Sequence, residues 1–170
     1  MSESVDAPKY DEAYFEALAK GGKKAPEETG GTLHLLTLRV EFEDVPGPAV
    51  VRQLDSAEAL AATKADAFVL PEGCHYRLTV DFRVDDASVA GVVYTSTHYR
   101  KGVRVSQDKL VLGSFPKQEK PQSVTFPRHG WEEAPIGILG RGSYTAKAQL
   151  HDDEGKALAE FEYAFDIRTV

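Results

Sequence analysis

The sequence predicts an all-β protein, an antiparallel β-sandwich preceded by a short N-terminal helical arm. From residue 33 onward, apolar and polar side chains alternate with a period of two in several segments, which is typical of strands with one buried face. Turn signals separate these short segments at regular intervals, and strands do not alternate with helices. Residues 1–31 lack this pattern and carry a helical one.

The arm comprises residues 1–31. Its helix is expected at about residues 11–20, where acidic residues open the segment and a lysine closes it before a glycine. A helix of about three turns is marginal alone in water, so we expect it to dock on a partner or on its own domain. Residues 21–31 are polar, with glycine and proline at both ends, and predict a linker.

The sandwich is expected over residues 32–170. The clearest alternation predicts strands at 36–43, 76–84, 143–150 and 160–168. Weaker patterns predict strands at 49–54, 89–100, 103–106, 108–115 and 122–126. Turns are expected at 46–48, 71–73, 101–102 and 152–155. Ser56 can cap one brief helix at about 57–64.

Composition excludes several classes of protein. A chain of 170 residues buries roughly 70% of its unfolded surface, so its core needs neither metal nor disulfide. No apolar run approaches the ~20 residues of a membrane span, and the N-terminus lacks the pattern of a signal peptide. One cysteine excludes an internal disulfide, and a cytoplasmic location is the simplest reading. The net charge of -7 disfavours nucleic acid and anionic membranes and favours a basic partner.

The residues give no positive reason to expect an enzyme. The sequence has no Gly-rich phosphate loop, zincin helix or nucleophile elbow. Its five histidines lack close metal-ligand spacing, so neither a metal nor a cofactor is expected. Cys74 is expected to be a small, partly buried residue, not a nucleophile. The carboxylate pairs at 85–86 and 152–153 fall in expected turns.

Several segments, in the same order, resemble the Rho GDP-dissociation inhibitors. The most specific is Glu132-Glu133-Ala134-Pro135-Ile136-Gly137-Ile138-Leu139-Gly140-Arg141-Gly142-Ser143-Tyr144. The others are Phe68-Val69-Leu70-Pro71-Glu72-Gly73, Tyr76-Arg77-Leu78, Phe82-Arg83-Val84, Tyr99-Arg100-Lys101-Gly102-Val103 and Leu112-Gly113-Ser114-Phe115. The resemblance covers about residues 33–167.

The resemblance implies an immunoglobulin-like sandwich that takes a geranylgeranyl chain between its sheets. It also implies an arm that grips a prenylated small GTPase of the Rho type with a basic C-terminal tail. Such a protein, expected to be a monomer, extracts the GTPase from membranes and slows GDP release. One alternative is a general lipid-binding carrier of prenylated or acylated proteins without control of nucleotide exchange. An enzyme that acts on a lipid is a third reading, but no nucleophile–base pair supports it.

The resemblance also implies candidate site residues. The lipid-pocket candidates are Val40, Phe68, Tyr76, Leu139, Ala146, Phe161 and Tyr163. Phe161 and Tyr163 replace family tryptophans, and Ala146 replaces a larger aliphatic residue, so the slot is expected to be reshaped. From periodicity alone, these positions would be ordinary core.

The candidates for contact with the GTPase are Asp11, Tyr14, Leu18, Glu132, Glu133, Asp152 and Asp153. The resemblance places the pair at 132–133 near the mouth of the pocket and the pair at 152–153 in a turn. A single exposed pair of charges contributes little to affinity, but a cluster can steer a basic tail. The alternative is that these carboxylates are ordinary solvent-exposed surface charges with no role in binding.

Overall fold

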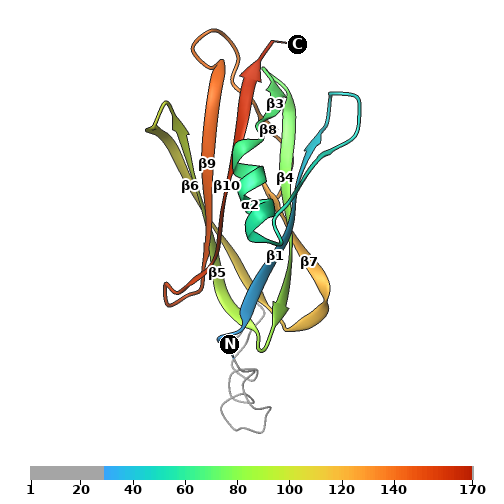
Figure 1. The fold of residues 1–170 in the computed structure, drawn as a ribbon, viewed down its shortest axis with the longest axis vertical. Helices are drawn as coiled ribbons and strands as arrows, with labels where there is room; N and C mark the ends of the chain where they lie inside the picture. Colours follow the sequence, from blue (N-terminus) through green and yellow to red (C-terminus); the bar gives the residue numbers. More distant parts are fainter. Residues whose placement is uncertain (1–28, 170) are drawn as a thin grey trace, which may run out of the picture.

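Two five-stranded sheets pack face to face in the computed structural model, which describes residues 29–169 (Figure 1). The first sheet has the order β2 (Val50–Gln53), β1 (Thr32–Phe42), β4 (His75–Asp85) and β7 (Gln118–Phe126), with β8 (Glu132–Glu133) also paired to β4. The second has the order β3 (Phe68–Pro71), β10 (Ala157–Arg168), β9 (Gly142–His151), β5 (Val89–Arg100) and β6 (Val103–Phe115). The predicted all-β sandwich is therefore confirmed.

The core lies between the sheets and is built from alternate residues of each strand. On β4 the buried positions include Val80, Phe82 and Val84, and on β10 they include Phe161 and Ile167. Successive side chains of a strand point to opposite faces, so one face of each sheet is apolar and the other meets solvent. This is the period of two from which the strands were predicted.

Helix α2 (Ala57–Ala65) confirms the predicted helix and its cap. The Ser56 hydroxyl accepts a hydrogen bond from the Ala59 amide at 3.0 Å, which satisfies one of the free N–H groups of the first turn. The helix packs against β10 and β2, away from β6 and β7. No helix within residues 29–169 is long and apolar enough to cross a bilayer.

Strand β6 differs from its prediction. Two short strands were expected at 103–106 and 108–115, but β6 runs unbroken over Val103–Phe115 and pairs with β5 along its length. It is an edge strand, and its residues 103–109 are all exposed. Strands β3 and β8 were not predicted, because segments of four and two residues are too short to show a period.

The start of the sandwich is held close to the β4–β5 connection. The Gly31 amide donates to the carbonyl of Ser88 at 3.0 Å, and a Cβ atom at residue 31 would lie only 1.8 Å from the Ala87 carbonyl oxygen. Only glycine allows this approach. The predicted arm helix at 11–20 lies outside the described residues, so the boundary between arm and sandwich stays a prediction.

Candidate functional site

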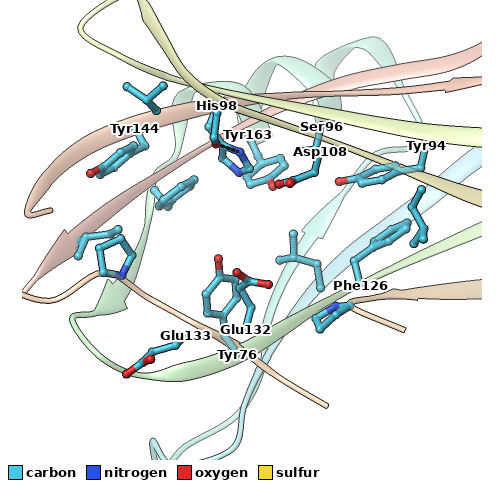
Figure 2. A pocket seen from close by; sticks show the side chains of 18 of the residues that line it. Tyr76, Tyr94, Ser96, His98, Asp108, Phe126, Glu132, Glu133, Tyr144 and Tyr163 are labelled. Carbon is cyan, nitrogen blue, oxygen red and sulfur yellow. Dashed lines mark hydrogen bonds between the residues drawn. The ribbon is translucent and has the colours of Figure 1, made fainter. Parts of the chain in front are cut away.

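A cavity of about 680 Å³ opens between the two sheets. Its volume is within the range of sites that bind small organic ligands, about 300–1,000 Å³. One wall comes from β4, β7, β8 and the loop after β8, and the other from β5, β6, β9 and β10. Figure 2 shows Tyr94, Ser96, His98, Asp108, Tyr144 and Tyr163 along one wall and Tyr76, Phe126, Glu132 and Glu133 along the other.

An aromatic stack joins the two walls. The rings of Tyr94, from β5, and Phe126, from β7, lie nearly parallel with centroids 3.9 Å apart. Tyr94 is buried, and burial raises the pKa of its hydroxyl to about 12. Because the two residues belong to different sheets, this contact fixes the separation of the walls at one side of the cavity.

A second set of rings builds the wall of β9 and β10. Tyr163 and Phe165 line the cavity, and Tyr144 stacks on Phe165 with ring centroids 5.2 Å apart. Phe68 and Phe161 each stack on Tyr163 with ring centroids 6.0 Å apart. Tyr163 is almost fully buried, which raises the pKa of its hydroxyl well above its usual value. These contacts hold the rings as a continuous apolar surface.

The register of the second sheet explains the shape of this wall. Ala146 lies opposite His98 on one neighbouring strand and opposite Tyr163 on the other. Ala148 lies in the same way between Ser96 and Phe161. A methyl side chain projects far less than its neighbours do, so the central strand leaves space between the side chains of β5 and β10.

Polar side chains occupy the β5 and β6 part of the wall. Asp108 lies opposite Ser96 in the register, and Ser106 lies opposite His98 with 3.2 Å between its hydroxyl and the ring Nδ1. Burial lowers the pKa of His98, although the negative charge of Asp108 opposes that shift. On the opposite sheet, burial raises the pKa of Tyr76, and the negative charge of Glu132 adds to that shift.

The loop after β8 forms the mouth and is fixed from both sides. Arg100 donates to the carbonyl oxygens of Leu139 and Arg141, and its guanidinium lies 5.4 Å from the ring of Tyr144. Glu72 accepts from the Gly137 amide at 2.8 Å and from Arg141 at 3.2 Å, and these bonds lower the pKa of that carboxyl. The mouth is thus held open by defined contacts to β5 and to the end of β3.

The structure brings together some of the predicted pocket residues. Tyr76, Leu139 and Tyr163 line the cavity, and so do Glu132 and Glu133, which are exposed on β8. The other four candidates are buried and do not line it, but each adjoins a lining residue. Val40 pairs with Leu78, Phe68 and Phe161 stack on Tyr163, and Ala146 lies between His98 and Tyr163.

Asp152 and Asp153 lie at the other end of the sandwich, in the turn between β9 and β10. Asp152 accepts from the amides of Glu154 and Lys156, as expected of a turn residue. The Asp153 amide donates to the Ala90 carbonyl at 3.1 Å, two residues from the Ser88 carbonyl that holds Gly31. The turn therefore lies near Gly31, at the start of the described sandwich (Figure 1). Asp11, Tyr14 and Leu18 lie outside the described residues.

Sequence reasoning missed the polar wall of the cavity. Ser96 and His98 share the inward face of β5 with Tyr94, two residues apart each time. A polar residue at an inward position of a strand was the available signal. Cys74, in contrast, is buried as expected, and burial raises the pKa of its thiol to about 11, which leaves it unreactive near neutral pH. Among the described residues no group of histidine, cysteine and carboxylate side chains could hold a metal ion.

Comparisons with known proteins agree on one family. A family model described as RHO protein GDP dissociation inhibitor matches residues 8–169. The chain is 41% identical over 173 residues to a protein of Dictyostelium discoideum named putative rho GDP-dissociation inhibitor 1, covering 98% of this chain and 87% of that protein. It is 36% identical over 132 residues to Rho GDP-dissociation inhibitor 1 of Homo sapiens, covering 77% of this chain and 61% of the human protein. For the Arabidopsis thaliana protein of the same name, the identity is 40% over 101 residues, 59% of this chain and 41% of that protein.

Proposed function

Because this chain belongs to the family of Rho GDP-dissociation inhibitors, we propose that it binds a prenylated Rho-type GTPase and slows its release of GDP. In the proposed cycle it shields the geranylgeranyl tail in the cavity between the sheets and so extracts the GTPase from membranes. The family is one of regulators, not of enzymes. We further propose that it acts as a monomer in the cytoplasm.

The cavity is the observation that carries this proposal. A lipid chain contributes about 0.8 kcal/mol per buried CH₂, so a twenty-carbon tail is worth on the order of 10 kcal/mol in a membrane. A carrier must bury a comparable apolar area of the tail if it is to compete with the membrane for it. The space of about 680 Å³, with Leu78, Phe126 and Phe165 in its walls, supports such a role.

The four predicted pocket residues that do not line the cavity could become part of its wall when a lipid enters. Phe68 and Phe161 are buried and in ring contact with Tyr163, which lines the cavity, so a chain that displaced the Tyr163 ring would approach both of them. Val40 lies beside Leu78, on the neighbouring strand of the opposite sheet. We propose that the cavity deepens toward these residues when a lipid enters.

Charge and topology support the contact with the GTPase. Glu132 and Glu133 stand at the cavity, where a basic segment next to the prenylated residue would pass. The turn with Asp152 and Asp153 adjoins the point where the arm joins the sandwich. The arm residues Asp11, Tyr14 and Leu18 are proposed to bind the GTPase together with this turn.

The test is the loss of labelled GDP from a prenylated Rho-type GTPase, measured with and without the purified protein. We expect a slower loss, and we expect the same GTPase to leave vesicles of neutral and anionic phospholipid when the protein is added. Unprenylated GTPase is the control, since it lacks the tail. Extraction without any change in GDP loss would replace this proposal with the alternative, a lipid-binding carrier.

A further inference from the structure

Exposed aliphatic side chains gather at the mouth of the cavity. Seven large hydrophobic side chains are exposed among residues 29–169, and five of them belong to the loop after β8 or to the start of β6. We call these five the rim cluster: Val103, Val105, Ile136, Ile138 and Leu139. Single exposed aliphatic residues are normal, but a group of them at one place is typical of a surface that binds another apolar body.

The two segments of the rim cluster are joined by Arg100. This residue is the register partner of Val103, and its guanidinium donates to the carbonyl oxygen of Leu139. Between β5 and β6 the chain makes a two-residue turn with positive φ at Lys101 and Gly102, 53° and 78°, as in a tight hairpin. Both segments therefore lie together, at the end of the sandwich opposite to the N-terminal label (Figure 1).

The rim cluster is continuous with the inside of the cavity. Val105 and Leu139 line the cavity, whereas the other three members do not. The pairing of β6 with β5 passes from Ser106 to Arg104, which leaves Val105 as the extra residue of a β-bulge. Because Val105 and Leu139 are both exposed and part of the cavity wall, they connect the rim cluster to the space between the sheets.

From this continuity we infer that the rim cluster contacts a phospholipid bilayer and passes the prenyl tail directly from the membrane into the cavity. This inference rests on the proposed function, which makes an isoprenoid chain the ligand. A tail that crossed through water would expose its whole hydrocarbon surface, and that cost is what keeps it in the membrane. A mouth held against the bilayer by its own aliphatic side chains avoids the exposure.

The charges around the mouth favour a neutral membrane surface over an anionic one. Lys101 and Arg104 are exposed next to Val103, but Glu132 and Glu133 are exposed on β8 at the cavity. Attraction to anionic lipids grows with the excess of basic residues, and here the opposite charges offset one another. The rim cluster therefore acts through burial of apolar surface, and a phosphatidylcholine bilayer is its partner.

The first experiment follows a geranylgeranylated peptide with a fluorescent label as it moves from phosphatidylcholine vesicles to the protein. The double variant Val103→Ser with Ile138→Ser removes two members of the rim cluster that do not line the cavity. Val51→Ser with Val111→Ser is the matched control, because these valines are exposed on β2 and on a distant part of β6, about 27 Å along the strand from Val103. The affinity for the peptide is also measured without vesicles, and urea unfolding verifies that each variant folds.

We expect the transfer rate of native protein to rise with protein concentration, because contact with the vesicle precedes transfer. In the rim variant the rate should fall about tenfold, which is about 1.4 kcal/mol, while the affinity without vesicles stays unchanged. The control variant should transfer like native protein. A rate independent of protein concentration, or an unchanged rate in the rim variant, would overturn the inference. A loss of affinity without vesicles would also overturn it and would show that the rim cluster binds the peptide itself.

A second measurement tests the membrane contact without a prenylated ligand. The chain has one cysteine, Cys74, which is buried, so Ile138→Cys can be labelled selectively with nitrobenzoxadiazole, whose emission rises in an apolar environment. We expect that rise when phosphatidylcholine vesicles are added, and none with the same label at Val111→Cys. No rise at residue 138 would overturn the inference. If the rise occurs but native protein does not bind the geranylgeranylated peptide, the proposed function fails and the membrane contact stands.

Discussion

Leu139 and Ile138 are consecutive residues of the loop at the mouth, and only Leu139 lines the cavity. Both are largely exposed, at 85% and 77% of their surface. Their backbone is fixed, because Arg100 and Glu72 hold the loop on both sides of them. The pair therefore offers two equally exposed positions that differ in their access to a ligand.

Leu139→Glu should weaken binding of a geranylgeranylated peptide by about tenfold, because a buried leucine contributes about 1.5–3 kcal/mol and a carboxylate would have to be desolvated. Ile138→Glu adds the same charge on the same loop and should leave the affinity nearly unchanged. A fluorescence titration of both variants measures the difference. Equal losses would mean that charge at the mouth matters and burial of Leu139 does not.

The stack of Tyr94 on Phe126 should stabilise the sandwich beyond the area that it buries. Aromatic pairs contribute about 0.5–1.5 kcal/mol of coupling, so we expect about 1 kcal/mol in a double-mutant cycle of Tyr94→Leu and Phe126→Leu. The free energy of unfolding in urea measures each variant. If the two single losses add up to the loss in the double variant, the stack contributes nothing of its own.

Charge reversal at Glu132 and Glu133 should slow association with a basic prenylated tail. The double change to lysine removes attraction between exposed charges, which acts mainly on the association rate and is screened by salt. Stopped-flow binding at low and high salt measures it, and the difference should shrink as salt rises. Asp55→Lys with Glu119→Lys makes the same charge change outside the cavity. If the control variant associates just as slowly, the effect comes from the net charge of the protein and not from the position of Glu132 and Glu133.

Removal of residues 1–24 should separate lipid binding from the control of GDP release. The cavity is made wholly of residues from 76 onward, so the truncated protein should bind the geranylgeranylated peptide nearly as native protein does. It should no longer slow the loss of labelled GDP from the GTPase. If the truncated protein still slows GDP loss to the native extent, the arm is not the inhibitory element.

Two histidines should titrate on opposite sides of their ordinary pKa of about 6.5. Burial lowers the pKa of His98, so its contribution to stability is complete above pH 6.5 and is lost as the pH falls toward the lowered value. The hydrogen bond to Asp44, at 2.8 Å, raises the pKa of His75, so its contribution is complete below pH 6.5 and is lost as the pH rises through the raised value. NMR titration of the ring protons reads each pKa, and the reverse order would contradict the cavity geometry around His98.

The strands could be predicted from the sequence because each buries one face. The pattern at 89–100 gave β5 with both its bounds, and 76–84 gave β4 to within one residue at each end. The prediction divided β6 into two strands, at 103–106 and 108–115, because exposed residues on both faces of its first half leave no alternation to join them. It could not find β3, because that strand depends on a parallel partner almost a hundred residues later in the chain.

The candidate site was harder to predict, for a different physical reason. Alternation marks which side chains point inward, but it does not tell a packed core from the wall of a cavity. Tyr76 and Tyr163 were therefore singled out only through the family resemblance, and the same resemblance also selected the buried, non-lining Val40 and Phe161. Ser96 and His98 escaped notice because a polar residue at an inward position interrupts the apolar alternation from which strands are predicted.

The close approach of Gly31 to Ala87 places the start of the sandwich far from the cavity. Gly31 sits beside the Asp85 end of β4, and the cavity residue Tyr76 lies nine residues back along that strand, about 30 Å away. The predicted linker at 21–30 has a contour length of at most about 35 Å and would join the predicted arm to this far end. In the proposed complex, a GTPase held by its tail at one end and by the arm at the other would be a bivalent ligand, and each contact would raise the local concentration for the second. Lengthening the predicted linker would then lower the affinity of the protein for the GTPase without changing either binding site.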